Sequence, residues 1–384
     1  MRIETLRKKM EEKNIDAAIL IYSRDVLYYA GTSRPCNLLI TRDDAFLFVR
    51  RAYEFVEKET YVKNLIKGGS FKLIKEKLDE YGIKEGVIGL ELDIIPAKLY
   101  LSLKKVFPNF AFLDISPLIL EQRLIKDKEE IKYTKKSAKI TDRGQSIARE
   151  AIREGMTELE LAVEVESEMR RNRHEGIIFN RRFDANLHYG LISSGDNLDK
   201  MTGFANVVTG VGLSKSFPQS ASERVIKKGD MIVIDIGGVY KGYHSDNGRT
   251  YVIGKIEKRQ VEVFDELKEV QQEILDNVCN GLKSSELYEI ALKKANEGKY
   301  SEFFMGYGEN KGNFVGHGLG LEIDEPPTIG PYDQTVLRKN MILAIELNTI
   351  IPEWGAVKLE DTILIKKDGY EVLTDTEREI FSVG

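Results

Sequence analysis

MIVIDIGGVYKGYHSDNGRTYVI (residues 231–253) carries the pattern that decides the fold of the second half of the chain. MIVID is an apolar run typical of a buried strand, and HSDNGRTYVI predicts a second strand that returns beside it. We expect the turn to begin at Gly237-Gly238 and the hairpin to be centred between residues 240 and 241. This register places Asp235 directly opposite Asp246 on one face of the sheet, with Cβ atoms about 5 Å apart. Two carboxylates this close on a buried face repel each other unless a cation lies between them.

A second hairpin, nearer the C-terminus, repeats this arrangement of paired carboxylates. ILAIELN and VKLEDTILI both predict strands, and Pro352 and Gly355 are suitable residues for the turn between them. A hairpin centred on Glu353 places Glu346 directly opposite Glu360. The sequence therefore predicts two independent hairpins that each present a pair of carboxylates.

A histidine in a glycine-rich segment completes the set of candidate ligands. His317 lies in GHGLG, where the backbone can approach a ligand closely. The four carboxylates balance the charge of two divalent cations, and a neutral imidazole adds no charge. Oxygen-rich ligands with one imidazole favour Mn²⁺, Co²⁺, Zn²⁺ or Fe²⁺ over metals that prefer thiolates. We therefore predict a site for two divalent metal ions, with the ligands Asp235, Asp246, His317, Glu346 and Glu360.

Composition narrows the class of protein further. The 384 residues include 57 basic and 62 acidic side chains, so the net charge of −5 argues against a nucleic-acid partner. No apolar stretch approaches the ~20 residues of a membrane span, and the N-terminal segment lacks the features of a signal peptide. Cys36 and Cys279 are too few for a disulfide framework and indicate free thiols. We expect a cytoplasmic enzyme without nucleic-acid or membrane partners.

Residues 1–124 alternate predicted helices and strands, which is typical of an α/β domain. We expect helices in LRKKMEEKNI, EFVEKETYVKNLI, FKLIKEKLDEYG and PAKLYLSLKKVF, and strands in AAILIY, GVIGLEL and FAFLDIS. NLLITRDDAFLFVR predicts a hairpin that turns near Asp43-Asp44. The segment has neither a GxGxxG loop nor a P-loop, so we expect no nucleotide site.

The pattern changes near residue 124, where we place the boundary between one domain at 1–124 and a second at 125–384. Residues 118–156 predict one long helix, and Thr157 is expected to cap the next helix with Glu160 at the capping-box position. Residues 198–222 predict a long loop rich in Gly, Ser and Thr. We expect this loop to line the active site or the mouth of its pocket, with a flexible surface insertion as the alternative.

These motifs resemble the pita-bread metallopeptidase superfamily, which includes Xaa-Pro dipeptidase (prolidase), aminopeptidase P, methionine aminopeptidase and creatinase. The resemblance also covers LRKKMEEKNIDAAILIYSRDVLYYAGT, EQRLIKDKEEIKYTKKSAKITDRG and GMTELELAVEVE, and so nearly the whole chain. It implies an α+β fold, in which a creatinase-like α/β domain precedes a pita-bread catalytic domain with a curved, mainly antiparallel sheet flanked by helices. The two-domain form is more similar to Xaa-Pro dipeptidase and aminopeptidase P than to methionine aminopeptidase. It also implies a homodimer.

The resemblance implies a hydrolase in which a metal-bridged hydroxide attacks an amide bond next to proline. Its five metal ligands map onto the residues named above. Glu346 is the candidate that carries the proton to the leaving nitrogen. The substrate is then a dipeptide or another small molecule.

Four departures from the family pattern put the substrate in doubt. The segment SKSFPQSASE lacks the histidine that precedes the R-x-I-x-x-G-D stretch in prolidase-like enzymes, and Asp324 replaces a second histidine. Glu346-Leu347-Asn348 replaces E-P-G, and Lys358 replaces the arginine before the last metal ligand. An ionised Asp324 would repel anions and attract cations, whereas a protonated Asp324 could donate a hydrogen bond. Asp324 is therefore a candidate catalytic residue, with a loop residue outside the pocket as the alternative.

His188 and His244 are the histidines nearest the predicted site. His188, on a predicted strand, is a candidate replacement for a missing imidazole, although the pattern favours a packed strand residue. His244 is expected to be a solvated or supporting residue. The alternative function is that of a non-peptidase of the superfamily acting on a small cationic or zwitterionic metabolite, similar to ectoine hydrolase or a lyase. A third possibility is a binding module, although such relatives tend to lose metal ligands.

Overall fold

The computed structural model describes residues 2–203 and 207–384. The chain divides into two compact units, residues 1–123 and 124–384. No helix among the described residues is long and apolar enough to cross a membrane. Each unit has its own sheet and its own buried apolar core.

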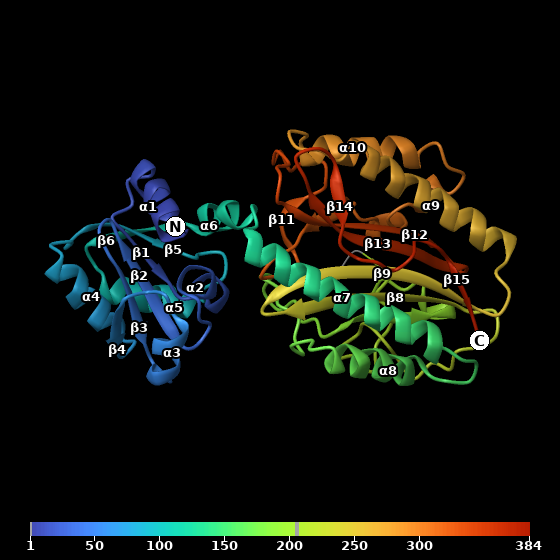
Figure 1. Ribbon diagram of the computed structural model, residues 1–384, viewed down its shortest axis with the longest axis horizontal. Helices are drawn as coiled ribbons and strands as arrows, with labels where there is room; N and C mark the ends of the chain where they lie inside the picture. The colour runs from blue at the N-terminus through green and yellow to red at the C-terminus, as the bar shows by residue number, and fades with distance from the viewer. Residues whose placement is uncertain (1, 204–206) are drawn as a thin grey trace. The chain divides into compact units, whose positions relative to one another are not determined.

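The N-terminal unit is built on a mixed sheet with the strand order β4-β3-β2-β1-β5-β6. β1 pairs antiparallel with β2 and parallel with β5, so the sheet changes direction at β1 (Figure 1). Its strands are β1 (Ala17–Leu20), β2 (Cys36–Thr41), β3 (Ala45–Val49), β4 (Asn64–Lys67), β5 (Gly86–Leu90) and β6 (Phe110–Asp114). Its helices are α1 (Arg2–Glu12), α2 (Ser23–Ala30), α3 (Tyr53–Glu59), α4 (Phe71–Glu80), α5 (Ala97–Val106) and α6 (Ser116–Arg123).

Most predicted elements of this unit are present, including the hairpin at Asp43-Asp44, where the Thr41 amide donates to the Asp44 carbonyl. Two details were wrong. α2 was not predicted, and the helix expected in EFVEKETYVKNLI ends at Glu59. The residues that follow form β4, which pairs parallel with β3 at the edge of the sheet. Pairing with β3 decides the conformation of this short segment, as tertiary context often overrides local propensity.

The long helix expected over 118–156 is interrupted. α6 ends at Arg123, and α7 (Lys128–Ala151) begins after Asp127. The Asp127 side chain accepts hydrogen bonds from the Glu129 and Glu130 amides, and Glu130 reaches back to the Asp127 amide. This capping box starts a new helix within a stretch of sequence whose apolar residues follow a single helical period. The predicted cap of α8 (Glu158–Arg171) by Thr157 and Glu160 is confirmed.

The C-terminal unit contains a mainly antiparallel sheet with the strand order β11-β10-β12-β13-β9-β8-β7, while β14 pairs with β13 and β15 with β9. Its strands are β7 (Gly190–Ser194), β8 (Met231–Tyr240), β9 (Tyr243–Ile253), β10 (Gly316–Gly318), β11 (Glu325–Thr328), β12 (Ile342–Ile351), β13 (Gly355–Ile365), β14 (Tyr370–Val372) and β15 (Phe381–Val383). Besides α7 and α8, it contains α9 (Lys258–Asn277), α10 (Ser284–Ala295) and the short 3-10 turns η1 (Gly195–Asn197), η2 (Ser301–Phe303) and η3 (Gly308–Asn310).

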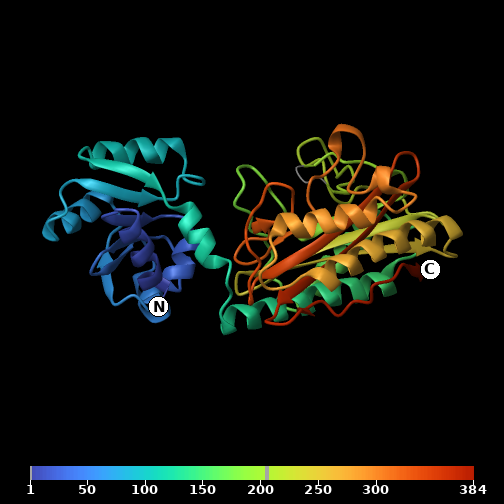
Figure 2. The same ribbon diagram turned by 90° about the horizontal axis from the view of Figure 1, so that it is seen from above.

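The helices cover the two halves of this sheet separately (Figure 1, Figure 2). α7 packs on β8 and β9, whereas α9 packs on β12 and β13. Along β8, Ile232, Ile234 and Ile236 belong to the core shared with α7 and α8, while Met231 and Val233 belong to the other core. Successive side chains of a strand point to opposite faces, so this alternation shows that both faces of β8 are buried. Asp235 therefore lies on the face that points away from α7.

The predicted register of the first hairpin was wrong by two residues. Asp235 lies opposite Gly248, and Asp246 lies opposite Gly237, because the turn is Lys241-Gly242 rather than Gly237-Gly238. Lys241 and Gly242 both have positive φ, as a tight two-residue turn requires. Since the shift is even, Asp235 and Asp246 still share one face, as diagonal rather than direct neighbours.

Gly237 and Gly238, which we expected to begin that turn, lie inside β8, where the absence of a side chain lets neighbouring residues approach closely. A Cβ on Gly238 would lie 2.6 Å from the carbonyl oxygen of Ser137 on α7. The second hairpin has the predicted register, with Glu346 opposite Glu360.

His174 links the end of α8 to β8 and generates a prediction about stability. Its Nδ1 accepts from the Gly176 amide at 2.9 Å and its Nε2 lies 3.0 Å from the Gly237 carbonyl, so the neutral ring with the proton on Nε2 fits. Burial lowers the pKa of His174 to about 4. In the unfolded chain, the His174 ring is protonated as the pH falls through about 6.5, whereas in the folded chain it stays neutral down to about pH 4. The stability due to the neutral ring is therefore present above about pH 6.5 and is lost as the pH falls towards 4.

We expect H174Q to be less stable than the wild type at pH 7, by a difference that shrinks as the pH falls to 4.5. Urea unfolding, followed by the fluorescence of Trp354, the only tryptophan in the sequence, measures this difference. A difference that stays constant between pH 7 and pH 4.5 would contradict the assignment.

Candidate metal centre and substrate pocket

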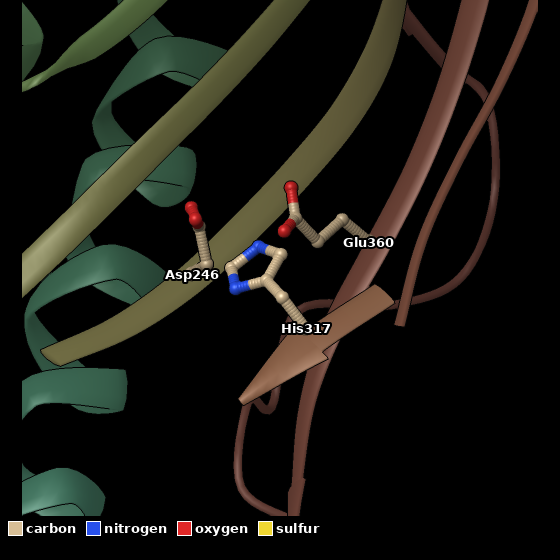
Figure 3. A group of neighbouring side chains, drawn as sticks. All are labelled: Asp246, His317 and Glu360. Atoms are coloured by element: carbon tan, nitrogen blue, oxygen red, sulfur yellow. The ribbon is translucent and has the colours of Figure 1, made fainter. Parts of the chain in front are cut away.

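The structure brings the five predicted metal ligands together, one from each of five strands. In one group, Asp246, His317 and Glu360 offer ligand atoms within 4.8 Å of one another; in the other, Asp235, Glu346 and Glu360 do the same. Figure 3 shows the first group, with Asp246 on β9, His317 on β10 and Glu360 on β13. Glu360 belongs to both groups. The arrangement therefore offers two neighbouring positions for a cation, with one shared carboxylate.

Gly248 lies at the middle of this arrangement. It is the ladder partner of Asp235 on one side and of Glu360 on the other. A Cβ on Gly248 would lie only 2.5 Å from Cε of Lys358. The missing side chain thus leaves space for the Lys358 chain, which runs from β13 across β9 to reach Asp235 on β8.

The ammonium of Lys358 is the buried counter-ion of the carboxylates. Its Nζ donates to Asp235 Oδ2 and to Glu346 Oε1, each at 2.5 Å, and lies 3.2 Å from Glu360 Oε2. The side chain is fully buried. In the sequence, Lys358 was only a replacement for a family arginine. In the structure, it contacts all three residues of the second group.

Burial and mutual repulsion govern the acid–base behaviour of the cluster. Burial raises the pKa of Asp246 to about 8, with the Asp235 charge acting in the same direction. Burial also raises the pKa of Glu360 and of Asp235 above their ordinary values. Burial acts in this direction on Glu346 too, but the positive charges of Lys358 and His317 outweigh it and lower its pKa. Glu346 is therefore ionised at neutral pH.

The donor set fits divalent metal ions. Both carboxylate oxygens of Glu360 are buried and lack a hydrogen bond within residues 2–203 and 207–384, and the ammonium of Lys358, 3.2 Å from Oε2, is their one ion-pair partner there. Buried polar atoms are nearly always satisfied, so a carboxylate left in this state needs a ligand. Carboxylate oxygens with one imidazole suit Mn²⁺, Co²⁺, Zn²⁺ or Fe²⁺. Asp246, His317 and Glu360 would hold one ion. Asp235, Glu346 and Glu360 would hold the other once the Lys358 ammonium, which contacts all three here, moves away from them.

A pocket opens over this cluster. Its lining includes Asp235, Asp246, His317 and Glu346, together with residues from the segment before β7. Val207 and Gln219, from the predicted loop 198–222, also line it. Residues 204–206 of that loop lie outside the described residues.

His188 lines the same pocket, two residues before β7 begins rather than on a strand. Its ring stacks on Phe217 with centroids 5.4 Å apart, and its Nδ1 accepts from the Tyr189 amide at 2.7 Å. Burial lowers its pKa, which favours the neutral ring at pH 7. His188 therefore belongs to the pocket lining, with a ring that burial keeps neutral at pH 7.

Asp324 also lines the pocket, but it is not a free negative charge. Its Oδ2 lies 2.6 Å from Nη2 of Arg182, which lines the pocket as well. This ion pair offsets the charge that we expected to repel anionic groups. Sequence reasoning missed Arg182, because it lies in a segment without periodicity, and only the adjacent pair Arg181-Arg182 marks it.

His244 lies outside the pocket lining. Its Nδ1 lies 2.9 Å from the Gly320 carbonyl, and its Nε2 accepts from the Phe179 amide at 3.1 Å. His244 therefore ties the segment after His317 to the segment before β7 and has a supporting role.

A buried set of carboxylates with one imidazole, lying under an open pocket, is the arrangement of a metal-dependent hydrolase. The comparisons with known proteins agree with this class. The model of metallopeptidase family M24 matches residues 132–367, and that of the creatinase/prolidase N-terminal domain matches residues 2–125. The chain belongs to metallopeptidase family M24.

Relatives of known name extend over the full length. An Xaa-Pro dipeptidase of Pyrococcus horikoshii is 32% identical, over 99% of this chain and 98% of the relative. The crystal structure of the prolidase from the same organism superposes with a TM-score of 0.82 at 31% identity, over 98% of this chain and 99% of that chain. The X-Pro aminopeptidase from Thermotoga maritima gives a TM-score of 0.82 at 26% identity, over 98% and 100% of the two chains. The predicted order of a creatinase-like domain and a pita-bread domain is confirmed.

Lys358 generates a prediction for the metal-free protein. K358M removes the counter-ion of the buried carboxylates, so we expect the free energy of unfolding at pH 7 to fall by about 3 kcal/mol or more after chelation. Added Mn²⁺ should reduce the loss, because a divalent cation replaces the missing charge. Urea unfolding followed by Trp354 fluorescence measures both effects. K132M, at an exposed lysine of α7, is the matched control and should change stability by about 0.5 kcal/mol or less. Equal loss in the two variants would overturn the role given to Lys358.

Proposed function

We propose that the chain is a dinuclear metal-dependent Xaa-Pro dipeptidase, which hydrolyses the amide bond before proline. The observation that carries this proposal is the pair of ligand groups sharing Glu360 beneath the pocket. The names of the relatives in Pyrococcus horikoshii and Pyrococcus furiosus, both Xaa-Pro dipeptidase, support the substrate class.

Two divalent ions (Mn²⁺, Co²⁺, Zn²⁺ or Fe²⁺) would be held by Asp235, Asp246, His317, Glu346 and Glu360. When bound, such ions lower the pKa of water and polarise a carbonyl group. The proposed enzyme acts as a homodimer, as its resemblance to prolidases implies, and in the cytoplasm, as its two free cysteines suggest.

Glu346 is the residue that we assign to proton transfer. It lines the pocket and is ionised at neutral pH, so it can accept a proton there. Lys358 holds Oε1, and Oε2 lies 3.8 Å from His317 Nε2, so the orientation of the carboxylate is set before a substrate arrives. The nitrogen that leaves from an Xaa-Pro bond becomes a secondary amine and needs a proton, which the protonated Glu346 can return. His188 and Asp324 line the substrate side of the pocket.

The alternative function is hydrolysis or lysis of a small cationic or zwitterionic metabolite. The specific observation in its favour is the absence of the two family histidines on the substrate side, with Asp324 in place of one. The ion pair of Asp324 with Arg182 weakens this case, because the pocket does not present a free carboxylate at that position.

Leu-Pro hydrolysis tests the proposal. We expect the chelated protein to be inactive and Mn²⁺ or Co²⁺ to restore activity, with about two ions bound per chain by elemental analysis. E346Q should lower kcat by about 100-fold or more, because Glu346 is the proposed proton carrier and also a metal ligand. E309Q, at an exposed glutamate, is the control and should keep full activity.

The outcomes separate the hypotheses. Two bound ions without Leu-Pro turnover would overturn the peptidase proposal and favour the alternative. No bound metal would overturn both.

A further inference from the structure

One residue of the pocket lining carries a positive charge that suits an anionic group. The lining carries the carboxylates Asp235, Asp246, Asp324 and Glu346, and Arg182 is the only lysine or arginine among the described lining residues. Asp235, Asp246 and Glu346 belong to the proposed metal centre, whose ions would balance their charge, so Asp324 is the carboxylate that a dipeptide's own carboxylate would meet beside that centre. Like charges at short range are unfavourable unless a cation is placed between them.

Arg182 is held so that part of its guanidinium stays available. Nη2 lies 2.6 Å from Asp324 Oδ2, and the arginine side chain remains 63% exposed against 23% for the aspartate. A guanidinium has five N–H donors in a planar fork, and one carboxylate does not use them all. The remaining donors suit a second, planar carboxylate in bidentate geometry.

Two hydrogen bonds hold the backbone next to this ion pair. The Ile323 amide donates to the Phe179 carbonyl at 2.9 Å, which joins the segment carrying Asp324 to the segment carrying Arg182. The Arg182 amide donates to Asn180 Oδ1 at 2.8 Å. An exposed ion pair contributes little to stability by itself, so the contact with Asp324 sets where the guanidinium lies rather than stabilising the fold.

We propose that Arg182, held by Asp324, binds the C-terminal carboxylate of the substrate and thereby selects dipeptides over peptides whose C-terminus is blocked or extended. This inference rests on the proposed function for the identity of the substrate. Arg182 is a specificity-determining residue in this account, and Asp324 is its positioning partner.

The test compares Leu-Pro with Leu-Pro amide, which lacks the carboxylate charge, on the metal-loaded full chain. R182Q should raise KM for Leu-Pro by about 10- to 100-fold, since it removes a charge-assisted bidentate contact, and should leave kcat nearly unchanged. KM for the amide should change by about twofold or less. R182K should recover part of the loss, because it restores the charge without the fork.

Two further variants control for charge and for Asp324. R171Q removes an exposed arginine from the end of α8 and should behave as the wild type with both substrates. In R182Q the carboxylate of Asp324 is unpaired and repels the substrate, so R182Q/D324N should bind Leu-Pro better than R182Q. R182Q and R182Q/D324N should bind Leu-Pro amide equally well, because the amide has no carboxylate for Asp324 to repel. Metal content and the circular dichroism spectrum should match the wild type in every variant.

Each outcome decides something about the two proposals. Equal effects of R182Q on Leu-Pro and its amide, or no effect, would overturn the role of Arg182 while Leu-Pro turnover by the wild type upholds the proposed function. If the wild type does not cleave Leu-Pro, thermal stabilisation by Leu-Pro is measured instead. Stabilisation that R182Q abolishes supports the carboxylate site although the proposed function fails. The absence of both cleavage and stabilisation overturns both.

Discussion

Repulsion among four buried carboxylates is the constraint on which the rest of this structure depends. Two unit charges 4 Å apart interact with about 4 kcal/mol at an effective dielectric constant of 20, and the cluster contains several such pairs. Lys358 supplies one positive charge from within the chain. Four carboxylates face this single ammonium, so Lys358 alone does not balance the cluster. Burial first, and then repulsion from neighbouring carboxylates, raise the pKa of Asp246 and of Glu360. Divalent ions would provide the missing charge.

The sheet is arranged to allow this concentration of charge. Alternation along β8 turns Asp235 away from α7, and the opposed pair Glu346 and Glu360 lies on the same side. Gly248 leaves the space that the Lys358 chain occupies between β8 and β13. Above the cluster the pocket adds Asp324, and Arg182 pairs with it and provides a positive charge. The fold therefore places positive side chains at two sites: Lys358 within the carboxylate cluster and Arg182 in the pocket lining.

Much of the fold and the metal centre could be predicted because short-range rules govern them. The turn residues of the second hairpin determine its register, and strand parity alone brings Asp235 and Asp246 to one face despite the shift of the first hairpin. The shift itself could not be foreseen, because Gly238 makes room for α7 rather than forming a turn. Arg182 was missed for a similar reason. Its partner Asp324 is distant in sequence, and neither residue has a local pattern that reveals the contact.

Diffraction from crystals grown with Mn²⁺, recorded at the manganese absorption edge, tests the central claim most directly. Our account predicts two anomalous peaks, one among Asp246, His317 and Glu360 and the other among Asp235, Glu346 and Glu360. The absence of peaks, with Asp235 and Glu346 still bonded to Lys358, would contradict it.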